Sequence, residues 1–202
     1  MSRPVSALAA SLAALAALAA LLIALPLAAA TLEVDITYPD GSAVPNAIAY
    51  AVPSRTLPTP RIVASIDQIN RTFVPHVLPV RAGTWVQFPN SDNVLHQVYS
   101  LSPAKRFQLP LYIGKPARPI QFDTPGVVAI GCNVHEQMNG FIVVVPTPYF
   151  ATAVNGRLAM TNLDADDYTV HVWYEGMRKE PEPRVVKLAA DGTAALAFVA
   201  VK

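Results

Sequence analysis

The sequence predicts an all-β protein built from β-sandwiches, and three observations lead to this fold class. The 202-residue chain contains 19 prolines and 9 glycines, a composition that disfavours long helices and suits short strands joined by fixed turns. Apolar and polar residues alternate over many short segments, and the 3.6-residue period of helices is nearly absent after residue 30. Turn signals separate these segments at intervals of roughly 8–12 residues, the spacing typical of sandwiches.

The first 30 residues have the features of an export signal. Arg3 supplies a positive charge, the alanine- and leucine-rich run Val5–Leu25 follows it, and three alanines end the segment at Ala30. We expect residues 1–30 to form a signal peptide cleaved after Ala30, which gives a periplasmic or otherwise exported protein without stable membrane insertion. An uncleaved anchor helix is the alternative, because the run is nearly long enough to span a bilayer.

The rest of the chain predicts strands from one end to the other. Thr31–Tyr38 alternates and is followed by a turn, Ala47–Val52 is a second strand, and Ser54–Pro60 is a proline-containing linker. Phe141–Val145 is a continuous apolar run, which is typical of a central strand. The other predicted strands are Ile62–Ile66, Phe73–Val80, Thr84–Phe88, Val94–Leu101, Leu109–Ile113, Pro119–Phe122, Val127–Ile130, Arg157–Met160, Tyr168–Tyr174, Val185–Leu188 and Ala194–Val201.

The charge balance excludes two classes of protein. The chain is 52% hydrophobic and 14% charged, with a formal net charge of +1 at pH 7. A disordered chain would carry fewer apolar residues, and a strongly cationic nucleic-acid binder would carry a large basic excess. We therefore expect a folded protein with no nucleic-acid partner.

One loop concentrates residues that bind transition metals. Cys132, His135 and Met138 follow one another at three-residue intervals between two predicted strands, and His96 lies on an earlier strand or loop. Two histidines and a cysteine with a weak axial methionine are the ligands of blue-copper electron-transfer sites. Zinc is the weaker interpretation because it prefers nitrogen, sulfur or oxygen ligands other than a thioether. Taken one by one, each residue could instead be an ordinary core or strand-end residue.

These motifs resemble the cupredoxin family. The resemblance lies in residues 72–75 (TFVP), residues 80–90 (VRAGTWVQFPN), the following His96, and the Cys-x2-His-x2-Met pattern of residues 132–138. Its short ligand loop is similar to that of amicyanin-like members. Residues 66–68 (IDQ) and 148–150 (PYF) extend the likeness to the exported, plastocyanin-like methylamine utilization proteins, over nearly all of the mature chain.

The resemblance implies a mononuclear type 1 site with one copper ion per chain. Its ligands would be His96, Cys132, His135 and Met138, with the methionine axial and His135 forming the exposed edge through which electrons pass. The protein would carry single electrons between redox partners of the cytochrome c or dehydrogenase type and would not be an enzyme. Two alternatives are a copper-holding or delivery protein and a structural β-sandwich module with a degenerate site.

The resemblance also implies a domain organisation and raises questions about neighbouring residues. Residues 60–148 would form the cupredoxin Greek-key sandwich, and residues 31–55 and 149–202 would form a second small, discontinuous sandwich of transthyretin or carboxypeptidase-regulatory type. The first strands could alternatively belong to the cupredoxin itself.

Gln97 replaces an asparagine that is common after the first histidine, so Asn133 is expected to link the ligand loops. We expect His76 to lie at the end of the sandwich away from the metal and His171 to lie on a sheet face.

Overall fold

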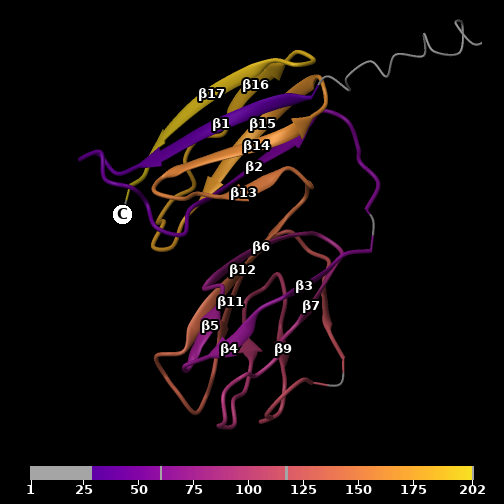
Figure 1. Cartoon of the computed structure of the whole chain (residues 1–202), viewed down its shortest axis with the longest axis vertical. Coiled ribbons are helices and arrows are strands. Elements are labelled where there is room, and N and C mark those ends of the chain that lie inside the picture. Colours follow the sequence, from indigo (N-terminus) through magenta and orange to yellow (C-terminus); the bar gives the residue numbers. More distant parts are fainter. Residues whose placement is uncertain (1–28, 60, 117, 202) are drawn as a thin grey trace, which may run out of the picture.

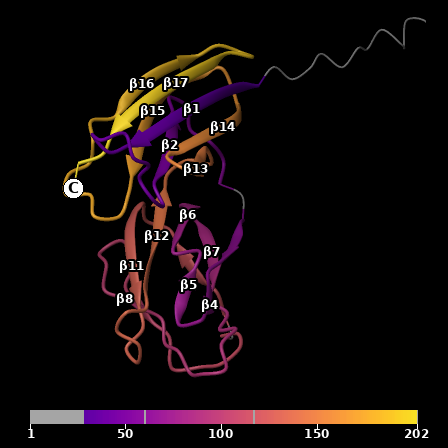
Figure 2. The same cartoon turned by 60° about the vertical axis from the view of Figure 1, so that its left-hand side comes forward.

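The structure of the protein is a computed structural model that describes residues 29–59, 61–116 and 118–201 (Figure 1). The described residues form seventeen β-strands and no helix, which confirms the predicted all-β class. Two groups of strands are separated in space (Figures 1 and 2). Strands β3 to β12 form one group, here called the inserted module, and β1, β2 and β13 to β17 form the other, the flanking module.

The inserted module contains a five-stranded sheet, a three-stranded sheet and a two-stranded hairpin. The five-stranded order is β6-β12-β11-β8-β9, in which β12 runs parallel to β6 and antiparallel to β11. The three-stranded order is β10-β7-β3, and the hairpin is β4-β5. The strands are β3 (Val63–Ser65), β4 (Asp67–Ile69), β5 (Thr72–Val74), β6 (Val77–Arg81), β7 (Thr84–Gln87), β8 (Tyr99–Ser100), β9 (Phe107–Gln108), β10 (Ile120–Phe122), β11 (Gly126–Gly131) and β12 (Asn139–Val145).

The sheets of the inserted module enclose an apolar core. Phe88, Phe122 and Ile142 are fully buried in it, and Cys132 and Met138 belong to the same cluster. In both views, the loop that joins β11 to β12 lies at the end of this module farthest from β13 and β14 (Figures 1 and 2). The candidate metal-binding loop is therefore anchored in the core of the inserted module and lies at its tip.

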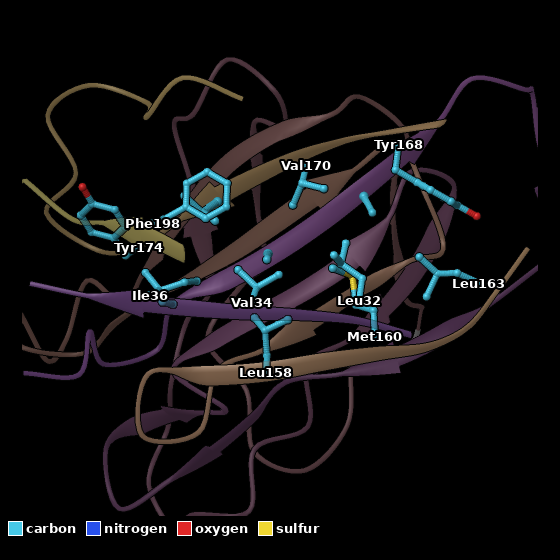
Figure 3. Close-up of a cluster of buried hydrophobic side chains, with 14 of the residues drawn as sticks. Leu32, Val34, Ile36, Leu158, Met160, Leu163, Tyr168, Val170, Tyr174 and Phe198 are labelled. Carbon is cyan, nitrogen blue, oxygen red and sulfur yellow. The ribbon is translucent and has the colours of Figure 1, made fainter. Parts of the chain in front are cut away.

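The flanking module consists of two facing sheets with the orders β14-β1-β17 and β13-β2-β15-β16. Leu32, Val34 and Ile36 of β1 point into its core, where Tyr168 and Val170 of β15 meet them (Figure 3). Alternate residues of β1 are thus buried, as expected for a strand with one apolar face. The strands are β1 (Ala30–Thr37), β2 (Ile48–Pro53), β13 (Phe150–Thr152), β14 (Arg157–Leu163), β15 (Asp166–Trp173), β16 (Arg184–Leu188) and β17 (Thr193–Val199).

The chain leaves the flanking module after β2 and returns to it at β13, which pairs antiparallel with β2. A third apolar cluster joins the two modules, with Val143 and Val145 of β12 against Ile48 and Trp173. The ring of Trp173 also packs on Phe141, with 5.3 Å between the ring centroids. The domain boundaries inferred from the sequence, and the transthyretin or carboxypeptidase-regulatory character of the flanking module, stay predictions.

Two predicted strands near the ligand loops are wrong. Of the segment Val94–Leu101, only Tyr99–Ser100 is a strand, and Leu109–Ile113 contributes isolated bridges instead. The reason is local side-chain bonding: the Asn90 amide Nδ2 donates to the carbonyl oxygens of Val94 and Tyr112, at 2.9 and 2.8 Å. Such bonds compete with the regular hydrogen-bond ladder of a sheet.

The predicted signal peptide falls almost wholly on residues 1–28, outside the described residues. Ala30 is buried and begins β1, where it pairs with Leu163. Cleavage after Ala30 stays a prediction and would leave Thr31 as the first residue of this strand. Within residues 29–59, 61–116 and 118–201, the structure contains no helix capable of crossing a bilayer.

Candidate metal centre

The loop between β11 and β12 holds three of the four predicted ligands. The last residue pair of the hairpin is Gly131 with Asn139, so the loop spans only residues 132–138. The Cys132 N–H donates to the Met138 carbonyl oxygen at 3.2 Å, and the Met138 N–H donates to the His135 carbonyl oxygen at 2.9 Å. These bonds close the loop and direct the Cys132 and Met138 side chains into the core, where they are 4% and 1% exposed.

His96 approaches this loop from a neighbouring segment and is fully buried. Its backbone exchanges two hydrogen bonds with Tyr112, at 3.0 and 3.1 Å. Its ring Nε2 lies 2.7 Å from Asp92 Oδ2. Because the carboxylate accepts, Nε2 carries the ring hydrogen and the lone pair is on Nδ1. That nitrogen lies 4.0 Å from Cys132 Sγ, so the free lone pair faces the thiol.

Asp92 is itself held by the turn of the β4–β5 hairpin. Asn70 and Arg71 both have left-handed backbone conformations, with φ of 53° and 58°, as two-residue hairpin turns require. Their N–H groups donate to the two carboxylate oxygens of Asp92, at 2.7 and 2.9 Å. Burial raises the pKa of Asp92, but the Arg71 N–H, the His96 ring and the Asn70 N–H outweigh it and lower the pKa. The carboxylate that orients His96 is therefore charged.

His135 completes a compact group of donor atoms. The ligand atoms of His96, Cys132 and His135 all lie within 4.8 Å of one another. The centroids of the two imidazole rings are 4.9 Å apart. His135 Nδ1 is buried without a hydrogen-bond partner, although the residue as a whole is half-buried. A buried nitrogen that lacks a partner costs free energy, which a bound metal ion would remove.

A pair of amides connects the two ligand segments. The Gln97 N–H donates to Cys132 Sγ at 3.5 Å, and Asn133 Nδ2 donates to Gln97 Oε1 at 2.6 Å. The connection expected of Asn133 is therefore present. Hydrogen bonds to a ligand and to its neighbours orient the ligand and tune the metal.

The three clustered side chains fit a copper ion. A buried thiol supplies a soft donor and two imidazole nitrogens lie within 4.8 Å of it, a combination suited to both oxidation states of copper. Met138 is buried in the same core cluster as Cys132, and its role as the axial ligand stays a prediction. The structure thus brings together His96, Cys132 and His135 as the sequence predicted.

The two remaining histidines belong to other parts of the molecule. His76 precedes β6, and its carbonyl oxygen accepts from the Phe141 N–H near the start of β12. Its expected place at the end of the sandwich away from the metal stays a prediction. Its ring faces the flanking module, with Nε2 at 2.9 Å from Glu175 Oε2. His171 lies on its sheet face as predicted, stacked on Tyr50 and 2.8 Å from Glu180. Neither belongs to the metal-binding group found among the described residues.

Asp92 was not identified from the sequence as part of the site. In the sequence, Asp92 lies four residues before His96 within a polar segment, and such a segment predicts only a turn. The contact depends on the β4–β5 hairpin, which is more than twenty residues away in sequence.

Comparisons with known proteins give structural but not sequence neighbours. No family model matches the chain, and no curated protein matches it significantly. A purple cupredoxin from Nitrosopumilus maritimus is similar at 24% identity and a TM-score of 0.37, covering 41% of this chain and 99% of that one. A reduced mutant of amicyanin has 22% identity and a TM-score of 0.37, covering 48% of this chain and 99% of that one.

A copper-containing nitrite reductase from Thermus scotoductus is also similar, at 24% identity and a TM-score of 0.39. The match covers 47% of this chain but only 24% of the reductase. The structural neighbours thus include cupredoxins, and each of these three matches covers less than half of this chain.

Proposed function

We propose that the protein binds one copper ion at His96, Cys132 and His135 and carries single electrons between redox partners outside the cytoplasm. The observation that carries the proposal is the meeting of three donor atoms within 4.8 Å, one of them a buried imidazole nitrogen without a partner. Copper would supply a Cu(II)/Cu(I) couple at this position.

The protein's own residues suit electron transfer because they hold the donors in one arrangement. Asp92 fixes the tautomer of His96, and the Gln97 N–H stabilises negative charge on Cys132 Sγ. The short, internally bonded loop limits movement of His135 and Met138. A rigid site changes little between oxidation states, which favours rapid exchange of an electron.

His135 is the route by which we expect electrons to enter and leave. It is half-buried, whereas His96 and Cys132 are buried, so its ring is the ligand nearest to solvent. Next to it, Val134 is 50% exposed and offers an apolar contact to a docking protein. Partners of the cytochrome c or dehydrogenase type, in a periplasmic methylamine utilization system, would fit such a carrier.

A copper-holding or delivery protein is the second candidate, and one observation favours it. An open cavity of about 620 Å³ adjoins the ligand loop, and Cys132, Asn133, Glu136 and Met138 are among its lining residues. Such an opening would help a partner to remove the ion. A second copper site of the kind an oxidase needs has less support, because His76 and His171 are each engaged by a glutamate.

The optical and electron paramagnetic resonance (EPR) spectra of the copper-loaded mature protein test the proposal. We expect an intense thiolate-to-copper band that is bleached and restored reversibly by one electron. Rapid loss of copper to a mild chelator would favour the delivery function. A protein that gives no thiolate band with a full equivalent of Cu(II) would refute both copper functions.

A further inference from the structure

A second buried atom without a partner lies close to the segments that carry the metal ligands. Among the described residues, the buried side-chain oxygen and nitrogen atoms without a hydrogen bond are His135 Nδ1, Gln68 Oε1 and Asp166 Oδ2. Asp166 Oδ2 is 3.4 Å from Arg55 Nε, so charge compensates it. His135 Nδ1 has its explanation in the metal centre. Gln68 is 0% exposed and its oxygen has no corresponding explanation.

The hydrogen bonds of Gln68 determine which side of the amide is unsatisfied. Its Nε2 donates to the Pro89 carbonyl oxygen at 3.0 Å and to the Tyr112 hydroxyl at 2.6 Å. The Tyr112 hydroxyl uses its own hydrogen to donate to the Phe88 carbonyl oxygen at 2.6 Å, so it can only accept from Gln68. Both partners of Nε2 are therefore acceptors, and exchanging the amide nitrogen and oxygen would lose both bonds. Oε1 is left as a free, oriented acceptor.

The residues around Gln68 are the same residues that hold the metal-binding segments in place. The Gln68 N–H donates to the Pro89 carbonyl oxygen, and the Ser91 N–H donates to the Gln68 carbonyl oxygen at 3.0 Å, immediately before Asp92. Tyr112 joins this group to His96 through two backbone hydrogen bonds.

Tyr112 also packs against the core cluster that contains Cys132 and Met138. The Tyr112 hydroxyl, which donates to Phe88 and accepts from Gln68, therefore holds the Gln68 amide next to this cluster.

We propose that Gln68 Oε1 is an additional oxygen donor to the metal at the His96, Cys132 and His135 centre. This inference rests on the proposed copper function. A buried amide oxygen that is aimed by two bonds on its nitrogen loses the cost of being unpaired when it contacts a cation. Carboxylate and carbonyl oxygens are hard donors, whereas Cu(I) favours soft thiolate and thioether donors. Gln68 would therefore stabilise Cu(II), lower the reduction potential and move the site toward a tetragonal geometry.

The test compares Gln68→Leu with Gln121→Leu, which makes the same chemical change on β10, where the Gln121 amide donates to the Gly83 carbonyl oxygen. In Gln68→Leu we expect a narrower parallel copper hyperfine splitting, a weaker high-energy thiolate band relative to the low-energy band, and a higher reduction potential. Gln121→Leu should match the native protein in all three. Gln68→Glu, which puts a charged oxygen at the same position, should shift each quantity the other way.

Nuclear magnetic resonance of the native protein loaded with Co(II) tests directly whether the Gln68 side chain contacts the metal. Protons of the Gln68 side chain should show large paramagnetic shifts that are assigned by their loss in Gln68→Leu, or in Gln68→Glu if the leucine variant does not fold. Unshifted Gln68 resonances, or copper spectra unchanged in Gln68→Leu with only the apoprotein's stability reduced, would overturn the inference and make Gln68 a structural residue. A native protein without a thiolate band would instead refute the proposed function itself.

Discussion

In the flanking module, strands of up to eight residues alternate buried and exposed positions, and its core is made almost entirely of apolar side chains. Around the metal centre the strands are two to seven residues long. The segments that connect them are held by amide, carboxylate and hydroxyl side chains. The same chain thus uses apolar burial to order one region and specific polar contacts to order the other.

The difference follows from what each region has to do. Burial of apolar surface is non-directional and stabilises a sandwich without fixing the position of any one atom. A metal site needs its donors positioned to a fraction of an ångström, which hydrogen bonds such as Asp92 to His96 and Gln97 to Cys132 supply. Substitutions in the two regions should therefore have separable effects on stability and on metal binding.

The largest expected effect is the loss of the thiolate band in Cys132→Ser. The absorption requires a sulfur donor on copper, and Cys132 is the only cysteine of the chain. Visible spectra of the copper-loaded protein measure the loss, and far-ultraviolet circular dichroism checks that the flanking module is still folded. A variant that keeps the band would show that Cys132 is not a ligand.

The opposite effect is expected for Leu32→Ala in the flanking module. Leu32 is 0% exposed between the two sheets, and truncation of a buried leucine typically costs about 2–5 kcal/mol. Denaturant unfolding of the apoprotein measures this loss of stability. The copper spectrum of the folded variant should equal the native spectrum; a changed spectrum would mean that the two modules are not independent in their chemistry.

The two regions also differ in how much the sequence predicts. The alternation of Leu32, Val34 and Ile36 identifies β1 to within a residue, because one apolar face leaves a period of two. The spacing of Cys132 and His135 predicts their common loop, since a short hairpin loop holds both side chains on one side. In each case the information lies within one local segment.

The supports of the site were not predictable in the same way. Asp92 binds the hairpin turn at Asn70 and Arg71, and Gln68 binds Tyr112, across separations of more than twenty and more than forty residues. No periodicity marks such contacts, because each depends on one polar side chain meeting one distant group. The wrong strand at Val94–Leu101 has the same cause, since Asn90 bonds replace the expected ladder there.

Asp92→Asn tests whether the polar contacts around the metal centre are needed for copper binding, as the contrast with the flanking module implies. An amide can present its nitrogen or oxygen to His96 and no longer fixes the ring's tautomer, so copper affinity should fall about 10–100-fold. Competition with a chelator of known affinity measures it. Glu180→Gln is the matched control, because it removes a carboxylate from His171 in the flanking module. Equal losses in both variants would contradict a specific role of Asp92.

A smaller change is expected for Met138→Leu. The apolar volume is nearly preserved, so the core cluster and the thiolate band should remain. Loss of a weak thioether donor destabilises Cu(II) more than Cu(I), which raises the reduction potential. Voltammetry of native and variant protein measures the shift. A colourless Met138 variant would mean that this side chain has a larger role than that of a weak axial donor.

The smallest effect is expected in the flanking module, where a polar contact ties β15 to the segment after β2. The Ser54 hydroxyl donates to Asp166 Oδ1, and this bond, aided against burial by the Asp167 N–H and by Arg55, lowers the pKa of Asp166. A carboxyl group whose pKa is lowered by folding stabilises the native state at pH values above its unfolded pKa of about 3.9. This stabilisation is lost as the pH falls through the pKa of the folded state. Ser54→Ala should therefore reduce the melting temperature slightly at pH 7 and by a smaller amount at pH 2, where more of the Asp166 carboxyl is protonated. Melting curves of the apoprotein at both pH values measure it. If the melting temperature falls by the same amount at pH 2 as at pH 7, the effect comes from the packing of Ser54 and not from the charge of Asp166, so that apolar contact outweighs charge in this region as well.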